Sequence, residues 1–121
     1  MTSKLVFSVL AAASLAVACS AALPHATDTH VGTAQARWPG TSVQDLERGR
    51  SDYTKRCTGC HHLHLPHEFP PDAWQHAVDE MRNKHGVRIS DDEANSILRY
   101  LITLSGEPNQ KAETSRNAAQ R

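Results

Sequence analysis

Two cysteines three residues apart, followed directly by a histidine, constrain this chain more than any other feature. The segment reads Cys57-Thr58-Gly59-Cys60-His61. Two thiols at this spacing can form a redox disulfide, supply half of a zinc site, or bind one prosthetic group covalently. The neighbouring ligands and the compartment in which the chain folds decide between these chemistries.

The adjacent histidine favours covalent haem attachment, because C-x-x-C-H is the arrangement of c-type haem sites. In such a site the two thiols add to the two vinyl groups of one porphyrin, and the imidazole ligates the iron. We therefore predict one covalent haem c and its iron, held by Cys57 and Cys60 with His61 as an iron ligand.

Two other chemistries stay open for the cysteine pair. A zinc site would need two further ligands, and several histidines are available nearby: His61, His62, His64 and His67. A thioredoxin-like dithiol is typical of a βαβ pattern, and no alternating strand pattern is present here. Haem is the interpretation that explains the histidine as well as the two thiols.

The N-terminus indicates export. Residues 5–17 are apolar apart from two serines, which is short for a membrane span and typical of a secretory signal. Residues 15–19 resemble a bacterial lipobox, in which Cys19 would be lipidated and become the new N-terminus. We expect a signal peptide over residues 1–19 and a periplasmic protein with a lipid anchor at Cys19. Cleavage at neighbouring small residues, which would give a soluble product, is the alternative.

The remaining chain divides into a tether, a core and a tail. Residues 20–40 and 106–121 lack a sustained apolar period, which predicts a flexible tether and a disordered tail. The core shows helical periodicity and capping residues in three stretches, 42–56, 72–85 and 91–104. We expect an all-α fold over residues 41–105, with about three helices packed around one haem.

This core resembles the class I c-type cytochromes, which are small mono-haem proteins. Residues 46–57 are similar to the N-terminal helix of that family, where a glycine and an aromatic residue precede the first haem cysteine, here Gly49 and Tyr53. Residues 92–101 are similar to the family's C-terminal helix. The resemblance implies that Gly49 and Tyr53 pack against this second helix, at Ile97, Tyr100 and Leu101.

The resemblance also bears on the identity of the sixth iron ligand. The stretch from Trp74 through Val78 to Met81 resembles a W-x-x-x-V-x-x-M segment of a compact branch of the family, which implies Met81 as the distal ligand. A thioether raises the potential of an electron-transfer haem. His85 lies one helical turn further on the same face and is the alternative ligand, and Met81 could also be ordinary core packing.

Apolar residues that follow the haem segment are expected to pack against the porphyrin and exclude water, namely Leu63, Leu65, Pro66, Phe69 and Trp74. A proline carbonyl, from Pro66 or Pro70, could accept the Nδ1 proton of His61 and fix its ring. We expect the other histidines of this loop, His62, His64 and His67, to be solvated side chains.

Charge and residue content bear on the function class. Lys plus Arg and Asp plus Glu number 13 each, so the totals give no support for nucleic-acid binding. No catalytic acid/base pair or nucleophile is visible, and we do not predict an enzyme, although the protein could be a subunit of an oxidoreductase. We predict a one-electron carrier whose partners are periplasmic or membrane redox proteins. The alternative is a five-coordinate haem protein that binds small gaseous ligands.

Overall fold

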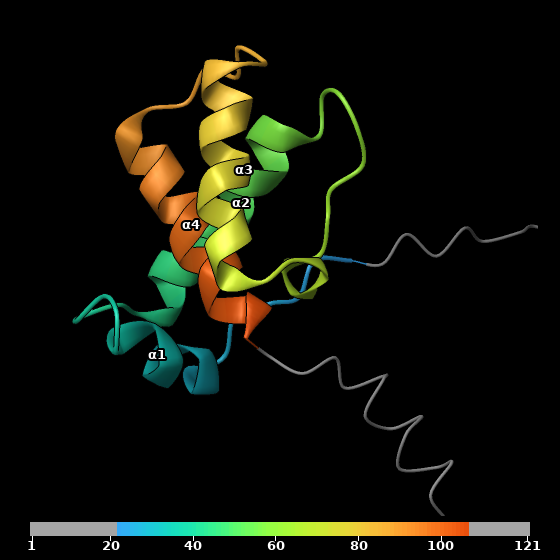
Figure 1. Ribbon diagram of the computed structural model, residues 1–121. Helices are drawn as coiled ribbons and strands as arrows, with labels where there is room; N and C mark the ends of the chain where they lie inside the picture. Colours follow the sequence, from blue (N-terminus) through green and yellow to red (C-terminus); the bar gives the residue numbers. More distant parts are fainter. Residues whose placement is uncertain (1–21, 107–121) are drawn as a thin grey trace, which may run out of the picture.

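The computed structural model describes residues 22–106. The predicted signal peptide, Cys19 and the predicted tail beyond Gly106 lie outside the described residues. Four α-helices and one 3-10 helix make up the described part, without strands, and Figure 1 shows their arrangement. Their order is α1 (Asp28–Gln35), α2 (Val43–Cys57), η1 (Pro66–Glu68), α3 (Pro71–Asn83) and α4 (Asp91–Ser105). The all-α prediction is confirmed, and the three expected helices are α2, α3 and α4.

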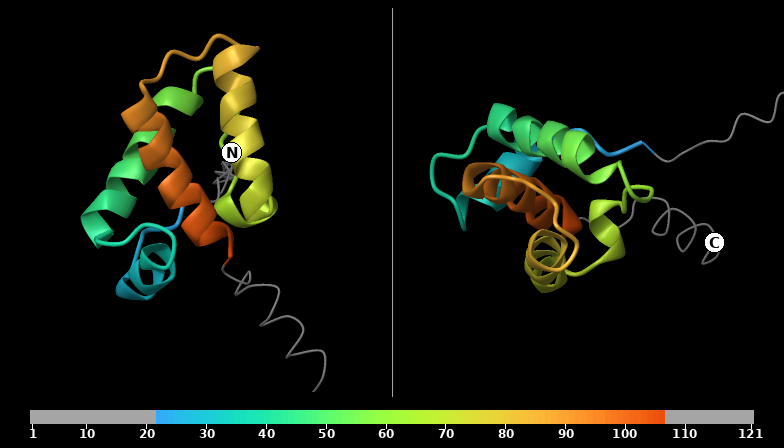
Figure 2. Two further views of the ribbon diagram at one scale, coloured as in Figure 1. Left: turned by 60° about the vertical axis from the view of Figure 1, so that its left-hand side comes forward. Right: turned by 90° about the horizontal axis from the view of Figure 1, so that it is seen from above.

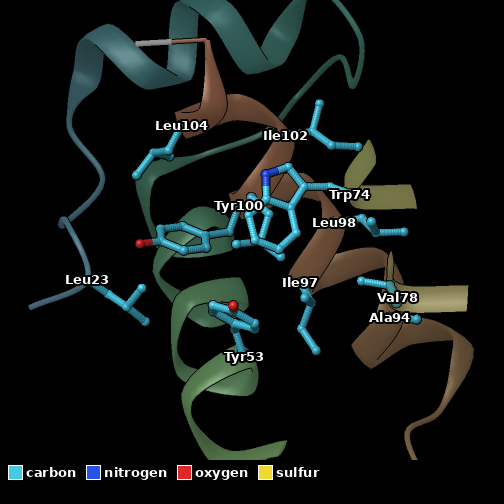
Figure 3. Close-up of a cluster of buried hydrophobic side chains, with 11 residues drawn as sticks. Leu23, Tyr53, Trp74, Val78, Ala94, Ile97, Leu98, Tyr100, Ile102 and Leu104 are labelled. Carbon is cyan, nitrogen blue, oxygen red and sulfur yellow. The ribbon is translucent and has the colours of Figure 1, made fainter. Parts of the chain in front are cut away.

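Helix α4 is the centre of the fold, because every other helix packs against it. Most of its side chains are buried, and Tyr100, Ile97 and Leu101 are fully so. Figure 3 shows Tyr100 and Ile97 in one hydrophobic cluster with Tyr53 from α2 and Trp74 from α3. Neither α4 nor any other helix among residues 22–106 is long and apolar enough to cross a membrane.

The crossing of α2 and α4 depends on Gly49. A Cβ atom at this position would overlap the carbonyl oxygen of Ser96 and lie 2.8 Å from Cβ of Tyr100. The glycine therefore lets the two helix backbones approach more closely than any side chain would allow. This contact agrees with the packing that the sequence implied for Gly49 and Tyr53 against α4.

Both of these helices begin with a reciprocal capping box. The Ser42 side chain accepts a hydrogen bond from the backbone N–H of Asp45 at 3.2 Å, and the Asp45 carboxylate accepts one from the Ser42 N–H at 2.9 Å. Ser90 and Glu93 do the same at the start of α4, at 3.1 Å and 2.9 Å. Each box satisfies backbone donors that the first turn of a helix leaves without partners.

Helix α3 begins at a pair of prolines and ends before a glycine turn. Pro70 is the N-cap residue and Pro71 the first residue of the helix, where the missing N–H costs nothing. Gly86 adopts φ of +68°, which reverses the chain towards α4. Figure 2 shows α3 standing beside α4, with the turn that follows it at the end of the molecule remote from α1.

Helix α1 departs from the prediction for residues 20–40, because much of that segment is not a tether in the structure. Leu23, His30 and Ala34 are buried, and α1 packs on α2 and α4. The segment is short and mostly polar, so its few buried side chains do not produce a helical apolar period. Its docking depends on side chains of α2 and α4 that the local sequence does not contain.

Candidate functional site

One pocket lies where the C-terminal ends of α2 and α3 meet the chain around the start of α4. Its volume is about 460 Å³, within the range of sites that bind small molecules and cofactors. Most of its wall is apolar. The lining residues that matter for its chemistry are Cys57, Cys60, His61, Met81 and His85.

The predicted attachment residues border this pocket together. Cys57 is the last residue of α2 and is half-buried, and Cys60 and His61 follow in the exposed turn. Burial raises the pKa of the Cys57 thiol above its ordinary value. The helix end therefore presents two thiols and an imidazole to the mouth of the pocket.

Both candidates for the sixth ligand also border the pocket. Met81 lies in α3 and is half-buried, and it shares the pocket-facing side of the helix with Val78 and Trp74. His85 follows the end of α3 and is exposed. The backbone N–H of Val87 donates to the Met81 carbonyl at 3.1 Å, so the turn that carries His85 folds back onto the end of α3. The fold thus brings Met81 and His85 to the same pocket as His61.

The loop between the cysteine segment and α3 is held by two buried aromatic side chains. The Tyr53 hydroxyl donates to the His64 carbonyl at 3.1 Å, and the Trp74 indole donates to the Pro66 carbonyl at 2.9 Å. Trp74 makes edge-to-face contacts with Tyr53 and with Phe69, whose ring centroids lie 6.1 Å and 5.2 Å away. These contacts fix the loop as one wall of the pocket.

The orientation of the His61 ring differs from the expectation. Its Nδ1 atom lies 2.7 Å from the carbonyl oxygen of His62, and no proline carbonyl is its partner. The Pro66 carbonyl accepts from Trp74 instead. A proton on Nδ1 satisfies the His62 carbonyl and leaves Nε2 as the nitrogen available to a metal.

An ion pair closes the edge of the pocket beside the cysteines. The Arg56 guanidinium donates to the Glu93 carboxylate at 2.6 Å and 2.9 Å and so joins the end of α2 to the start of α4. The Ser90 backbone N–H and Arg56 hold the pKa of the Glu93 carboxyl below its usual range. Because both groups are partly exposed, the pair contributes more to geometry than to stability.

The remaining histidines of the loop do not form a metal centre. His62 and His67 are exposed and lie outside the pocket, and His64 pairs with Glu68 at 2.7 Å. His76 is exposed on the opposite side of α3 and pairs with Glu80 at 3.9 Å. Within residues 22–106 no three His, Cys, Asp or Glu side chains converge as metal ligands, which is what the zinc alternative would need.

Sequence reasoning did not assign several pocket residues to the site. Val87 and Ile89 line it from the segment between α3 and α4, and Ile97 lines it from α4 itself. No periodic pattern marks the first two, and only the folded positions of α3 and α4 bring them to the pocket. The sequence did not indicate a role for Arg56 in the site, because a charged residue beside Cys57 is expected to be solvent-exposed. Its contact with Glu93 of α4 is visible only in the folded structure.

An all-helical fold with an apolar pocket beside a C-x-x-C-H segment defines a c-type cytochrome. The family model for dihaem cytochrome c matches residues 53–121, more than half of the chain, and the chain belongs to this family. Membership supports haem binding and electron transfer. It names a dihaem family, however, whereas the sequence resembles the mono-haem class I proteins. No significant match to the chain is found among curated proteins or among solved structures.

Proposed function

We propose that this protein is a mono-haem c-type cytochrome that carries single electrons in the bacterial cell envelope. The observation behind the proposal is that Cys57, Cys60 and His61 border the same apolar pocket as Met81. Two cysteines to attach a porphyrin covalently, with an imidazole and a thioether as the two protein ligands of the iron, are the residues that a six-coordinate haem c requires. The residues present therefore fit the cofactor that the family implies.

The proposal also specifies the number of haems that the chain binds. The printed sequence contains one C-x-x-C-H segment, and its third cysteine, Cys19, has no cysteine or histidine beside it. Covalent attachment of a second haem c would need a second cysteine pair. We propose one haem in this chain, although the family is described as dihaem.

Each part of the pocket has a task in electron transfer. A bound haem would supply iron that accepts and releases one electron between its ferric and ferrous states. The His62 carbonyl would hold the Nδ1 proton of His61 and keep Nε2 directed to the metal. Trp74, Val78 and Ile97 exclude water from the inner wall, and low solvent access tunes the reduction potential.

Met81 is our proposed sixth ligand, and absorption spectra of two single variants test it. Haem-loaded wild type should show a c-type spectrum with the weak far-red sulfur-to-iron band, unchanged by carbon monoxide. Met81→Ala should lose that band and respond to carbon monoxide, whereas His85→Ala should keep it. The opposite pattern would assign His85. A wild type that already shifts with carbon monoxide would favour the five-coordinate, gas-binding alternative, and a colourless protein would refute the haem.

The location of the protein is a second part of the proposal. The apolar run over residues 5–17 and the lipobox-like residues 15–19 support export and a diacylglyceryl anchor on Cys19. The electron partners would then be redox proteins of the periplasm or of the membrane. The intact mass of the protein from a bacterial membrane fraction tests this. Lipidation adds acyl groups to Cys19, and cleavage of the signal peptide removes the residues before it. A soluble product of unmodified mass would contradict the anchor and leave the haem proposal standing.

A further inference from the structure

Arg56 brings a permanent charge to the edge of the pocket. Within the described part of the chain it is the only lysine or arginine that lines the pocket, and no aspartate or glutamate does so. The other lining side chains are apolar or neutral apart from three histidines. Because arginine stays protonated at any pH that the protein meets, this apolar pocket is bordered by one fixed positive charge.

Glu93 determines where that charge lies. Its Oε1 atom accepts hydrogen bonds from Nε and Nη2 of Arg56, at 2.9 Å and 2.6 Å. Its Oε2 atom accepts from the backbone N–H of Ser90 at 2.9 Å, which is one half of the capping box that begins α4. The carboxylate is therefore held by its own helix while it holds Arg56. Since Glu93 does not itself line the pocket, the positive member of the pair is the one that faces it.

A fixed charge beside a haem acts on its two oxidation states unequally. With neutral imidazole and thioether ligands, the ferric haem carries one more positive charge than the ferrous haem. A positive charge nearby disfavours the ferric state by Coulomb repulsion, and a negative charge favours it. Arg56 directly precedes Cys57, so an attached porphyrin would have its thioether edge beside the guanidinium. Arg56 and Glu93 would then act on the iron in opposite directions.

We propose that Arg56 and Glu93 set the reduction potential of the haem as a pair of opposed charges. The proposal rests on the haem proposed above for this pocket and adds a role for two residues that do not bind the iron. Arg56 raises the potential, whereas Glu93 lowers it and positions the guanidinium at the pocket edge. In each transfer the iron takes up one electron from a donor and passes it to an acceptor. The potential therefore decides which donors and acceptors this protein can serve.

The pair also joins α2 to α4, and a purely structural role predicts a different result. If the pair only held the two helices together, replacing either partner would break the same contact and shift the potential in the same direction. If the charges act on the iron, replacing Arg56 and replacing Glu93 shift it in opposite directions. Glutamine suits both positions because it is neutral, and at position 93 it can still accept a hydrogen bond.

Potentiometric titration of the full-length, haem-loaded protein, followed by its absorption spectrum, measures the effect. Arg56→Gln should lower the potential and Glu93→Gln should raise it. Each change should shift the equilibrium constant with a one-electron mediator roughly threefold, or about 30 mV. Arg56→Lys keeps the charge and should stay near the wild-type potential. Both shifts should shrink as the ionic strength rises, because salt screens charges at a partly exposed site.

Arg48→Gln is the matched control. Arg48 also reaches from α2 to α4, where its Nε donates to Oγ of Ser96 at 3.4 Å. It lies about two helical turns before Arg56 and does not line the pocket, so this variant should keep the wild-type potential. Shifts of the same sign for Arg56→Gln and Glu93→Gln, or no shift in either, would overturn the proposal. A wild type without a c-type spectrum would instead refute the haem itself, and the spectrum is recorded before any potential.

Discussion

At the scale of single residues, Gly49 shows how one position sets the distance between two helices. The site requires α2 and α4 to lie close together, because Tyr53 and Ile97 reach the pocket from these two helices. The Ser96 carbonyl occupies the space that a side chain at position 49 would need. A backbone oxygen cannot move aside as a flexible side chain can, so a larger residue would separate the helices.

Gly49→Ala should therefore destabilise the protein by about 3 kcal/mol, the upper part of the range for overpacked cores. Gly32→Ala is the matched control, since a Cβ at this position of α1 meets nothing within 4 Å. That change should be neutral or stabilise by up to about 1 kcal/mol, because alanine favours the helix. Urea unfolding followed by circular dichroism measures both. Equal stability of the two variants would contradict the close crossing.

At the scale of elements, residues 23–27 before α1, which we call the strap, show how a short segment can be held by a few directed contacts. Glu47 is its main partner on α2, and three neighbouring groups favour the charged carboxylate: the Ala26 N–H, His25 and Arg50. Although burial opposes ionisation, these contacts hold the pKa of the Glu47 carboxyl below its usual value of 4.5. The charged form of Glu47 therefore stabilises the fold.

The docked strap should loosen in acid. Because the folded-state pKa of Glu47 is depressed, its stabilisation is fully present above pH 4.5 and is lost as the pH falls through the folded-state value. Glu47→Gln should make the unfolding free energy less dependent on pH in this range. Amide exchange of strap residues, measured at neutral and acidic pH in both proteins, reports the effect locally. Identical acid sensitivity in wild type and variant would exclude Glu47 as its source.

At the scale of the whole molecule, the described chain is a small helical domain with a large apolar pocket. Apolar side chains on the pocket wall, such as Phe69 and Ile89, are partly exposed, and a bound porphyrin would cover them. A cofactor bound only to the native state stabilises that state by mass action, and a covalent one cannot dissociate. Folding and haem attachment should therefore be strongly coupled.

Replacing both haem cysteines tests this coupling. Cys57→Ser together with Cys60→Ser should yield a protein with little helix by far-ultraviolet circular dichroism, since a domain of this size has a marginal core. Haem-loaded wild type of the same length is the control and should show the full helical spectrum. A native-like helical spectrum from the double variant would show that the strap, α1 and the α2–α4 contact suffice for folding.

The sequence alone determined the features that follow from local spacing. The C-x-x-C-H segment identified the chemistry, and the capping boxes and apolar periods located α2, α3 and α4 to within about two residues, the usual uncertainty of helix ends. Tertiary structure decided the rest. Contacts with Glu47, Arg50 and Tyr100 hold the strap against the core. The fold of the loop places the Nδ1 atom of His61 next to the His62 carbonyl and not next to a proline carbonyl. These outcomes depend on groups distant in sequence or on loop geometry, and no periodicity in the chain encodes where such groups meet.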